Sequence, residues 1–425
     1  MRRPWVKYPL LFVGLIAAYL LFALVSSLMP NGPIIRHAAK TQTLGDLQTD
    51  FAFAISCRPE YYMDNFTDAL IINQACHGGK DSLLTNILLV PRADGGGEQC
   101  NSLQRLTHTP DPSEEGSDTT LHTIHYGRYW HGSTFLMRFL LLMADYTSLR
   151  PLFYLLSSLL LVWLVVALFR RCGLAVASLF VLALTLVNVF IMQFSIQLLP
   201  VLALSLIGSL VVLNHVKKPS QLNRLLFVLG SLTAFFDLLT CPMLTWGIPL
   251  CVYLIMQWRH PLPAPFLRRL KDWAVASLLW VVSYGTTWVS KWGIATLLTG
   301  ENVIRDGAAN FSIRAGAYID YSRLDALTRN LDLLPWSFVC ITLIILLVLA
   351  LWRFNRGGLP TALLCLLTAL PPLAWYLVAA DHSYLHYWFT YRSLAVPLMA
   401  IFFALASLVD WRRIPLHPKH PTSLR

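Results

Sequence analysis

Charged residues are scarce in this chain. Only 13% of its 425 residues are Asp, Glu, Lys or Arg, while 56% are hydrophobic and the mean hydropathy is +0.57. A soluble domain carries about a quarter charged residues. Several apolar runs instead reach the ~20 residues that a helix needs to cross ~30 Å of hydrocarbon. The composition therefore excludes a soluble globular protein and predicts an all-α, polytopic helical membrane protein.

About ten apolar stretches are candidates for transmembrane helices, within one membrane domain over residues 1–425. An even number of spans places both termini on the same side of the membrane. The first loop, residues 30–150, is much the longest. The expected spans are 8–29, 152–169, 174–190, 198–213, 225–239, 244–258, 273–289, 336–351, 361–378 and 394–408.

Acidic residues are nearly absent from one side of the predicted bundle. That side holds about 18 basic residues against two acids, Asp272 and Asp410, whereas the other side holds about 15 against 20. An excess of Lys and Arg marks the cytoplasmic side of a membrane protein. Both termini are thus expected in the cytoplasm, with outer loops 30–150, 291–332 and 381–392 beyond the cell membrane, which we take to be a bacterial inner membrane. The net charge of +11 follows from this topology and indicates no nucleic-acid partner.

The sequence also lacks several motifs. No A-x-A cleavage site follows the first span, so we expect this span to remain uncleaved. His382 and His386 share a helical face, but no HExxH motif accompanies them, and no cysteine spacing is typical of zinc. No cofactor is predicted with certainty, and a divalent cation is left open. Among the eight cysteines, Cys57, Cys76 and Cys100 fall in the first outer loop, where a Cys57–Cys76 disulfide is compatible with an oxidising compartment.

Two carboxylates lie four residues apart in the aromatic-rich stretch 61–69. Asp64 and Asp68 share one face of a helix, and the apolar spacing predicts an amphipathic helix over 64–76. As a helix N-cap and a first-turn acid, the two residues have a structural role. Alternatively, Asp64 is a general base that is partly desolvated by the neighbouring aromatics. The residues alone leave both interpretations open.

The other polar clusters fall on the same, outer side. Arg128 and Arg392 lie among aromatic residues, where an arginine either anchors the membrane interface or binds phosphate. Asp237 lies near the outer end of a span, where it faces the headgroups, pairs with one of these arginines, or contacts a substrate. Histidines of these clusters are candidates for donating a hydrogen bond to a phosphate or for acting as acid–base groups. The candidate substrate-binding residues are Asp68, Arg128, Tyr129, Trp130, His131, Asp237, His386 and Arg392.

The layout of the first 170 residues resembles the GT-C superfamily of integral membrane glycosyltransferases. Asp64 takes the position of the catalytic carboxylate that this group carries in its large first outer loop. The stretch 64–76 resembles the first juxtamembrane helix, and 135–144, too short to cross the membrane, resembles the second and is expected at the interface. Arg150 lies where the group has an arginine at the start of its second span.

The resemblance implies an enzyme that moves a sugar from a polyprenyl-phosphate-linked donor to an extracytoplasmic acceptor. The donor is a membrane lipid, and the acceptor is a cell-envelope glycan, a lipid or a protein. In this interpretation Asp64 activates the acceptor hydroxyl, and Arg128 and Arg392 hold the leaving phosphate. The other candidate residues support the site, with the aromatics stacking on the sugar or covering it.

Two other classes remain open. A transporter or flippase of lipid-linked or envelope precursors is expected to carry polar residues through the membrane depth. The predicted spans have almost no charge at their centres, and no internal repeat is visible. A polysaccharide polymerase or ligase relies on Arg and His, which His386 and Arg392 provide, but usually has its large outer loop late in the chain. The early position of loop 30–150 favours the glycosyltransferase.

Overall fold

Helices form where the sequence is continuously apolar, because hydrocarbon offers no hydrogen-bond partner to an open backbone. The computed structural model describes residues 4–77, 81–108, 121–260 and 264–411, and a helix lies in each of the ten expected spans. These helices are α1 (Pro4–Ser27), α7 (Tyr146–Cys172), α8 (Leu174–Thr185), α9 (Leu199–His215), α10 (Pro219–Phe236), α11 (Met243–Arg259), α12 (Phe266–Thr299), α15 (Trp336–Trp352), α16 (Leu359–Val378) and α19 (Ala395–Ser407).

Length and composition qualify only some of these helices as membrane spans. Four segments qualify on their own, and a fifth span is added if α14 (Arg323–Leu331) and α15, which meet at an angle of 81°, are counted as one. The others in the described ranges are too short or too polar; α8, for example, has only 12 residues. The helical membrane character is thus supported, while the number of ten spans stays a prediction. Four segments meet both criteria on their own: Lys7–Ser27, Tyr146–Cys172, Arg356–Val378 and Tyr387–Ser407.

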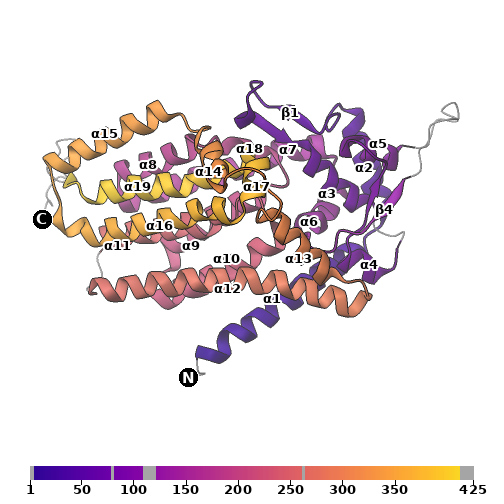
Figure 1. Ribbon diagram of the computed structural model, residues 1–425, viewed down its shortest axis with the longest axis horizontal. Coiled ribbons are helices and arrows are strands. Elements are labelled where there is room, and N and C mark those ends of the chain that lie inside the picture. Colours follow the sequence, from indigo (N-terminus) through magenta and orange to yellow (C-terminus); the bar gives the residue numbers. More distant parts are fainter. Residues whose placement is uncertain (1–3, 78–80, 109–120, 261–263, 412–425) are drawn as a thin grey trace, which may run out of the picture.

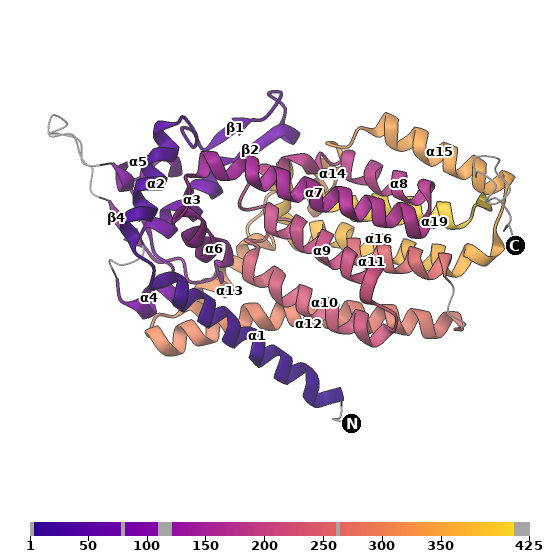
Figure 2. The same ribbon diagram turned by 180° about the vertical axis from the view of Figure 1, so that it is seen from behind.

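The helices form an elongated bundle, and the described residues of 30–145 form a head at one end of it (Figure 1). Helix α10 packs against α12, α9 against α11, and α16 against α19. Seen from behind, the N-terminal part of α1 stands away from the bundle (Figure 2). Short elements connect the bundle helices: η2 (Val189–Phe194), α13 (Val303–Arg314), η3 (Arg356–Gly358), α17 (Ala380–Leu385), α18 (Tyr387–Thr390) and η4 (Tyr391–Leu394).

The head is built from short helices braced by two antiparallel strand pairs. Phe51 lies opposite Asp64 in the first pair, and Arg92 lies opposite Ile124 in the second. The elements of the head are α2 (Asn31–Thr43), β1 (Phe51–Phe53), η1 (Pro59–Tyr61), β2 (Tyr62–Asp64), α3 (Asn65–His77), α4 (Leu83–Leu88), β3 (Arg92–Asp94), α5 (Gln99–Thr107), β4 (His122–Ile124) and α6 (Gly132–Leu141).

Helix α3 is buried on every side, which differs from the amphipathic helix expected over 64–76. All of its residues except Phe66 are buried, because α2, α5 and α6 pack around it. Helix α6, expected at an interface, is also packed inside the head, with Met137 and Leu141 fully buried. The spacing of apolar residues along a helix does not reveal how many other elements pack against it. For this reason the sequence predicted that both helices bury only one face.

A buried arginine fastens the first span to the head. Arg138 Nε donates to the Ser26 carbonyl at 2.9 Å, and Nη2 donates to the Met29 carbonyl at 3.0 Å and to Asn31 Oδ1 at 2.7 Å. Nη1 donates to the Ala75 carbonyl of α3. All three guanidinium nitrogens of Arg138 therefore donate hydrogen bonds to acceptors of the protein itself.

The expected Cys57–Cys76 disulfide is absent, and all eight cysteines are free thiols. Cys57 is exposed in the connection between β1 and β2, whereas Cys76 is buried inside α3. Burial raises the pKa of the Cys76 thiol to about 12. Two cysteines whose side chains point into such different surroundings do not meet the geometry of a disulfide.

Gly230 allows α10 and α12 to approach each other closely. A Cβ atom at this position would lie 2.4 Å from the Trp280 carbonyl oxygen. We expect Gly230→Ala to separate the helices and to lower the free energy of unfolding by about 1–3 kcal/mol, the usual cost of overpacking. The measurement is thermal melting of the purified protein in detergent. Gly293→Ala in α12 is the matched control, because open space surrounds a Cβ there; identical melting of the two variants would contradict the prediction.

Candidate functional site

Asp64 ends strand β2 and caps helix α3. Its Oδ1 accepts a hydrogen bond from the Thr67 backbone N–H at 3.0 Å, and its Oδ2 accepts one from the Thr67 hydroxyl at 3.0 Å. Burial raises the pKa of Asp64 to about 7, the bonds from Thr67 oppose the rise, and the charges of Asp68 and Asp50 add to it. Asp64 thus makes the hydrogen bonds of an N-cap.

Asp68 belongs to a buried network that occupies both of its oxygens. The carboxylate accepts hydrogen bonds from the hydroxyls of Tyr146 and Ser195, the latter at 2.9 Å, and from the Gln197 N–H at 3.3 Å. Arg150 Nη2 lies 3.6 Å from Asp68 Oδ2. The network joins α3 to α7 and to the segment after η2. In this structure both oxygens of Asp68 are bonded within the protein, and the substrate contact expected from the sequence stays a prediction.

Arg150 lies in the first turns of α7 and braces the head. Its Nη1 forms an ion pair with Asp46 at 2.7 Å, and its Nη2 donates to Asn65 Oδ1 at 2.7 Å. Because Asn65 follows the capping residue Asp64, this arginine holds the start of α3 in place.

Arg392 reaches the head from the far end of the sequence. It is fully buried, and its Nη2 donates to the Glu60 carbonyl at 2.9 Å, while its Nη1 donates to the Trp388 carbonyl at 2.6 Å. The segment 381–392 therefore folds against the residues just before Asp64. Both terminal nitrogens are bound to carbonyls, so Arg392 cross-links the two segments, whereas Nε has no hydrogen-bond partner in the described part of the chain. The phosphate contact of Arg392 stays a prediction.

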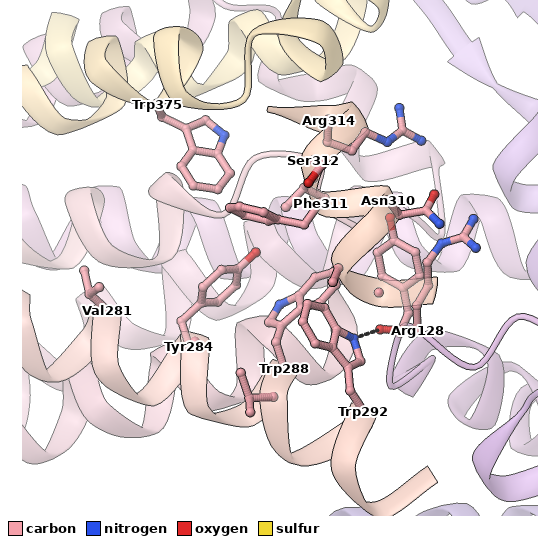
Figure 3. A pocket seen from close by; sticks show the side chains of 16 residues that line it. Arg128, Val281, Tyr284, Trp288, Trp292, Asn310, Phe311, Ser312, Arg314 and Trp375 are labelled. Atoms are coloured by element: carbon pink, nitrogen blue, oxygen red, sulfur yellow. Dashed lines mark hydrogen bonds between the residues drawn. The ribbon is translucent and has the colours of Figure 1, made fainter. Parts of the chain in front are cut away.

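A cavity of about 540 Å³ lies between α12, α13 and the end of α16 (Figure 3). We call it the aromatic groove. Four aromatic residues of α12 are spaced four apart, so they share one face of the helix. The rings of Trp280 and Tyr284 stack at 5.0 Å, and those of Trp288 and Trp292 meet at 6.1 Å. The aromatic lining residues are Tyr129, Tyr284, Trp288, Trp292, Phe311 and Trp375.

Two arginines line the aromatic groove, and Figure 3 shows their guanidinium groups on the same side of the rings. Arg128 pairs with Asp306 at 3.3 Å and stacks on the Tyr126 ring at 4.1 Å. The charge of Arg128 is therefore largely matched within the protein.

Arg314 has no such acidic partner. Its Nη1 lies 2.9 Å from His386 Nε2. Burial, helped by the charge of Arg314, lowers the pKa of His386 to about 4, so the histidine is neutral and Nε2 accepts the hydrogen bond. Within the described ranges, no carboxylate forms an ion pair with Arg314. A positive charge without a counter-charge thus borders the groove.

The phenol of Tyr129 lies within reach of the charges around the groove. Burial raises the pKa of Tyr129; the charges of Arg314 and Arg128 oppose the rise, and the charge of Asp237 adds to it. Asp237 comes two residues before Leu239, which also lines the groove. Three residues singled out in the sequence, Arg128, Tyr129 and Asp237, therefore belong to one neighbourhood.

Asp237 directly follows α10 and is buried. Its Oδ1 accepts hydrogen bonds from the N–H and the hydroxyl of Thr240, at 2.9 and 2.5 Å, whereas Oδ2 has no hydrogen-bond partner in the described part of the chain. Asp237 pairs with neither Arg128 nor Arg392, which use other partners. The interpretation that Asp237 pairs with one of these arginines is therefore wrong. The contact of Asp237 with a substrate stays a prediction.

His131 and Trp130 are held by the protein itself. His131 Nε2 donates to the Tyr126 carbonyl at 2.7 Å, and burial lowers the pKa of His131 to about 3, so its ring is neutral. Trp130 Nε1 donates to the Thr287 carbonyl at 2.8 Å and ties the head to α12. Neither residue lines the groove, so the geometry gives both a positioning role.

The two histidines spaced four apart do not form a metal centre. Their rings lie 4.8 Å apart, but His382 Nε2 donates to the Leu239 carbonyl at 2.6 Å, and His386 is bonded to Arg314. Among the described residues, no group of three or more His, Cys, Asp or Glu side chains is arranged to hold a metal ion. The divalent cation left open by the sequence therefore has no ligand set there.

The structure divides the expected site residues between two places. Arg128 and Tyr129 line the groove, His386 holds Arg314 beside it, and Asp237 lies behind it. Asp64 and Asp68 lie in the head. Sequence reasoning missed Arg314 and the groove aromatics, although Trp280, Tyr284, Trp288 and Trp292 stand at helical spacing and were a visible signal.

An apolar, aromatic groove bordered by an unmatched guanidinium, with a buried carboxylate two residues from its lining residue Leu239, suits an amphiphilic anion with hydroxyl groups. The rings offer stacking surface, the guanidinium matches phosphate oxygens, and the carboxylate accepts from a hydroxyl. No protein-family model, no curated protein and no solved structure matches this chain.

Proposed function

We propose that this protein is a membrane glycosyltransferase that takes its sugar from a polyprenyl-phosphate-linked donor. The observation that carries the proposal is Arg314, a cation without an acidic partner that borders a largely aromatic groove. Guanidinium groups bind phosphate with paired hydrogen bonds. The neutral His386 beside it orients the side chain without cancelling its charge.

The groove also suits the hydrocarbon part of a lipid donor. Val281 and Val289 of α12 both line it, and both are exposed on the apolar surface of the helix. A lipid chain enters from that side with its phosphate toward Arg314, and the rings of Trp288 and Trp292 pack against the chain. This arrangement uses apolar burial for the lipid and charge for the phosphate.

Two carboxylates are candidates for the base that activates the acceptor hydroxyl. Asp64 is the residue expected from the sequence and from the GT-C resemblance. Asp237 comes two residues before Leu239, which lines the groove. The acceptor is an envelope glycan, lipid or protein on the extracytoplasmic side, following the charge asymmetry of the loops, with both termini in the cytoplasm.

Lipid binding by the purified protein in detergent tests this function. We expect a short polyprenyl phosphate to bind roughly 10- to 100-fold more tightly than the matching polyprenol, because hydrogen bonds to a charged group contribute about 1.5–3 kcal/mol. Quenching of tryptophan fluorescence reports both affinities.

Trp288→Ala separates the two contributions to binding. We expect this substitution to weaken the binding of both lipids by a similar factor, since the ring packs on the hydrocarbon chain that the two lipids share. Equal affinity of the unmodified protein for the phosphate and the alcohol would rule out the donor class. Binding of the phosphate lipid with its translocation across proteoliposomes, and without sugar transfer, would favour a flippase instead.

A further inference from the structure

The position of Asp237 is costly for the fold. A buried carboxylate needs hydrogen bonds on both oxygens, yet Oδ2 forms none within the described ranges, and the N–H groups of Leu238 and Leu239 stabilise the carboxylate only from nearby. The residue also follows the C-terminus of α10, where the helix dipole disfavours negative charge. Asp64 and Asp68 differ in both respects, because they lie at the N-terminal end of α3 and their oxygens are bonded.

The backbone around Asp237 is strained as well. Leu239 has φ 71°, a left-handed conformation that is a genuine outlier for a bulky residue. Its side chain lines the aromatic groove, and its carbonyl accepts the hydrogen bond from His382 at 2.6 Å. The turn is thus held against the groove from the far side by α17. Strain of this kind persists where surrounding structure enforces it, often at functional sites.

Asp64 lacks these features. Thr67 donates to both of its oxygens, and the charges of Asp68 and Asp50 raise its pKa. Its environment is explained by the cap of α3. Asp237 comes two residues before Leu239, which lines the groove, and its charge raises the pKa of Tyr129, which the charge of Arg314 lowers.

We infer that Asp237 is the catalytic base of the transfer, with Oδ2 facing the acceptor hydroxyl in the donor complex. This inference rests on the proposed function. The acceptor oxygen forms a bond to the anomeric carbon of the sugar, and its proton passes to Asp237 Oδ2. The bond between the anomeric carbon and the phosphate oxygen breaks, and its electron pair leaves with the lipid phosphate, which Arg314 stabilises.

Turnover of Asp237→Asn in the full-length protein tests the assignment. The donor is the polyprenyl-phosphate hexose that the unmodified protein converts fastest in a panel, and release of polyprenyl phosphate is measured. We expect kcat to fall 10²- to 10⁴-fold, the range of general-base catalysis, while affinity for polyprenyl phosphate changes less than twofold. Asn keeps an oxygen for the bonds from Thr240, so the fold is retained.

Two further variants make the result specific. Asp237→Ala is expected to regain part of its turnover in formate, a small carboxylate that replaces the missing base, which a structural defect would not do. Asp320→Asn, an exposed acid of the second outer loop, is expected to behave as the unmodified protein.

The outcomes separate this inference from the function on which it rests. If Asp237→Asn binds the lipid phosphate and turns over at the normal rate, Asp237 is not the base although the function stands. If Asp64→Asn instead loses turnover while remaining folded, the base is Asp64. If the unmodified protein neither prefers the phosphate lipid nor converts any donor, the proposed function itself fails.

Discussion

Arg314→Gln is expected to weaken binding of a polyprenyl phosphate by about 10- to 100-fold and to leave binding of the matching polyprenol unchanged. The side chain supplies a charge that no described carboxylate neutralises, and the hydrogen bonds of a guanidinium to phosphate contribute about 1.5–3 kcal/mol. Glutamine keeps a hydrogen-bond donor for His386 but carries no charge. The difference between the two lipids therefore isolates the charge from the shape of the groove.

Arg305→Gln is the matched control for this experiment. Arg305 lies on the same helix, α13, and is exposed, and it does not line the groove. Its replacement is expected to change neither affinity by more than twofold. A similar loss for phosphate and alcohol in Arg314→Gln would mean that Arg314 only maintains the groove, and no loss would place the phosphate elsewhere.

Asp64→Asn is expected to stabilise the protein above neutral pH. In the folded protein the pKa of Asp64 is raised to about 7 from its ordinary value of 3.8, chiefly by burial. Because the pKa is higher in the folded than in the unfolded protein, the Asp64 carboxyl contributes fully to stability below about pH 4. This contribution is lost as the pH rises to about 7. The full loss corresponds to roughly 4 kcal/mol. Asn caps a helix as well as Asp does and carries no charge.

Melting of the two proteins in detergent between pH 4 and pH 8 checks this expectation. Both are expected to melt alike near pH 4, and the variant is expected to melt higher from pH 7 upward, with a weaker dependence on pH between. Asp320→Asn serves as the control, since an exposed acid leaves the pH profile unchanged. Parallel profiles for Asp64→Asn and the unmodified protein would show that the Asp64 charge is compensated.

Local pattern was enough to predict several elements. The ten apolar stretches are helical, and the spacing around Asp64 predicted a helix that is present as α3, because helix formation depends on neighbours three and four residues apart. The same reasoning placed Asp64 correctly as an N-cap in one of its two interpretations. The Cys57–Cys76 disulfide that the sequence left open is not formed, and spacing in sequence could not decide this because it does not determine which side of a helix is buried.

The candidate site depended on contacts between distant segments. Arg128 and Tyr129 were identified from their aromatic surroundings, but their neighbours Asp306 and Trp288 come from loops and helices more than a hundred residues away. Arg314 was overlooked because nothing near it in sequence marks it; its partner His386 is 72 residues distant. Arg392 was expected to bind phosphate, yet its Nη2 donates a hydrogen bond to the Glu60 carbonyl, 332 residues away in the sequence.

The sequence by itself determined the class of this protein, a helical membrane protein, because scarcity of charge and long apolar runs leave few alternatives in water. It also determined which stretches form helices and which polar residues are candidates for a site. Only the tertiary structure decided which of those polar groups are satisfied. A buried arginine bound to carbonyls and one left without a counter-charge look the same in a sequence, because the difference lies entirely in what other segments bring beside them.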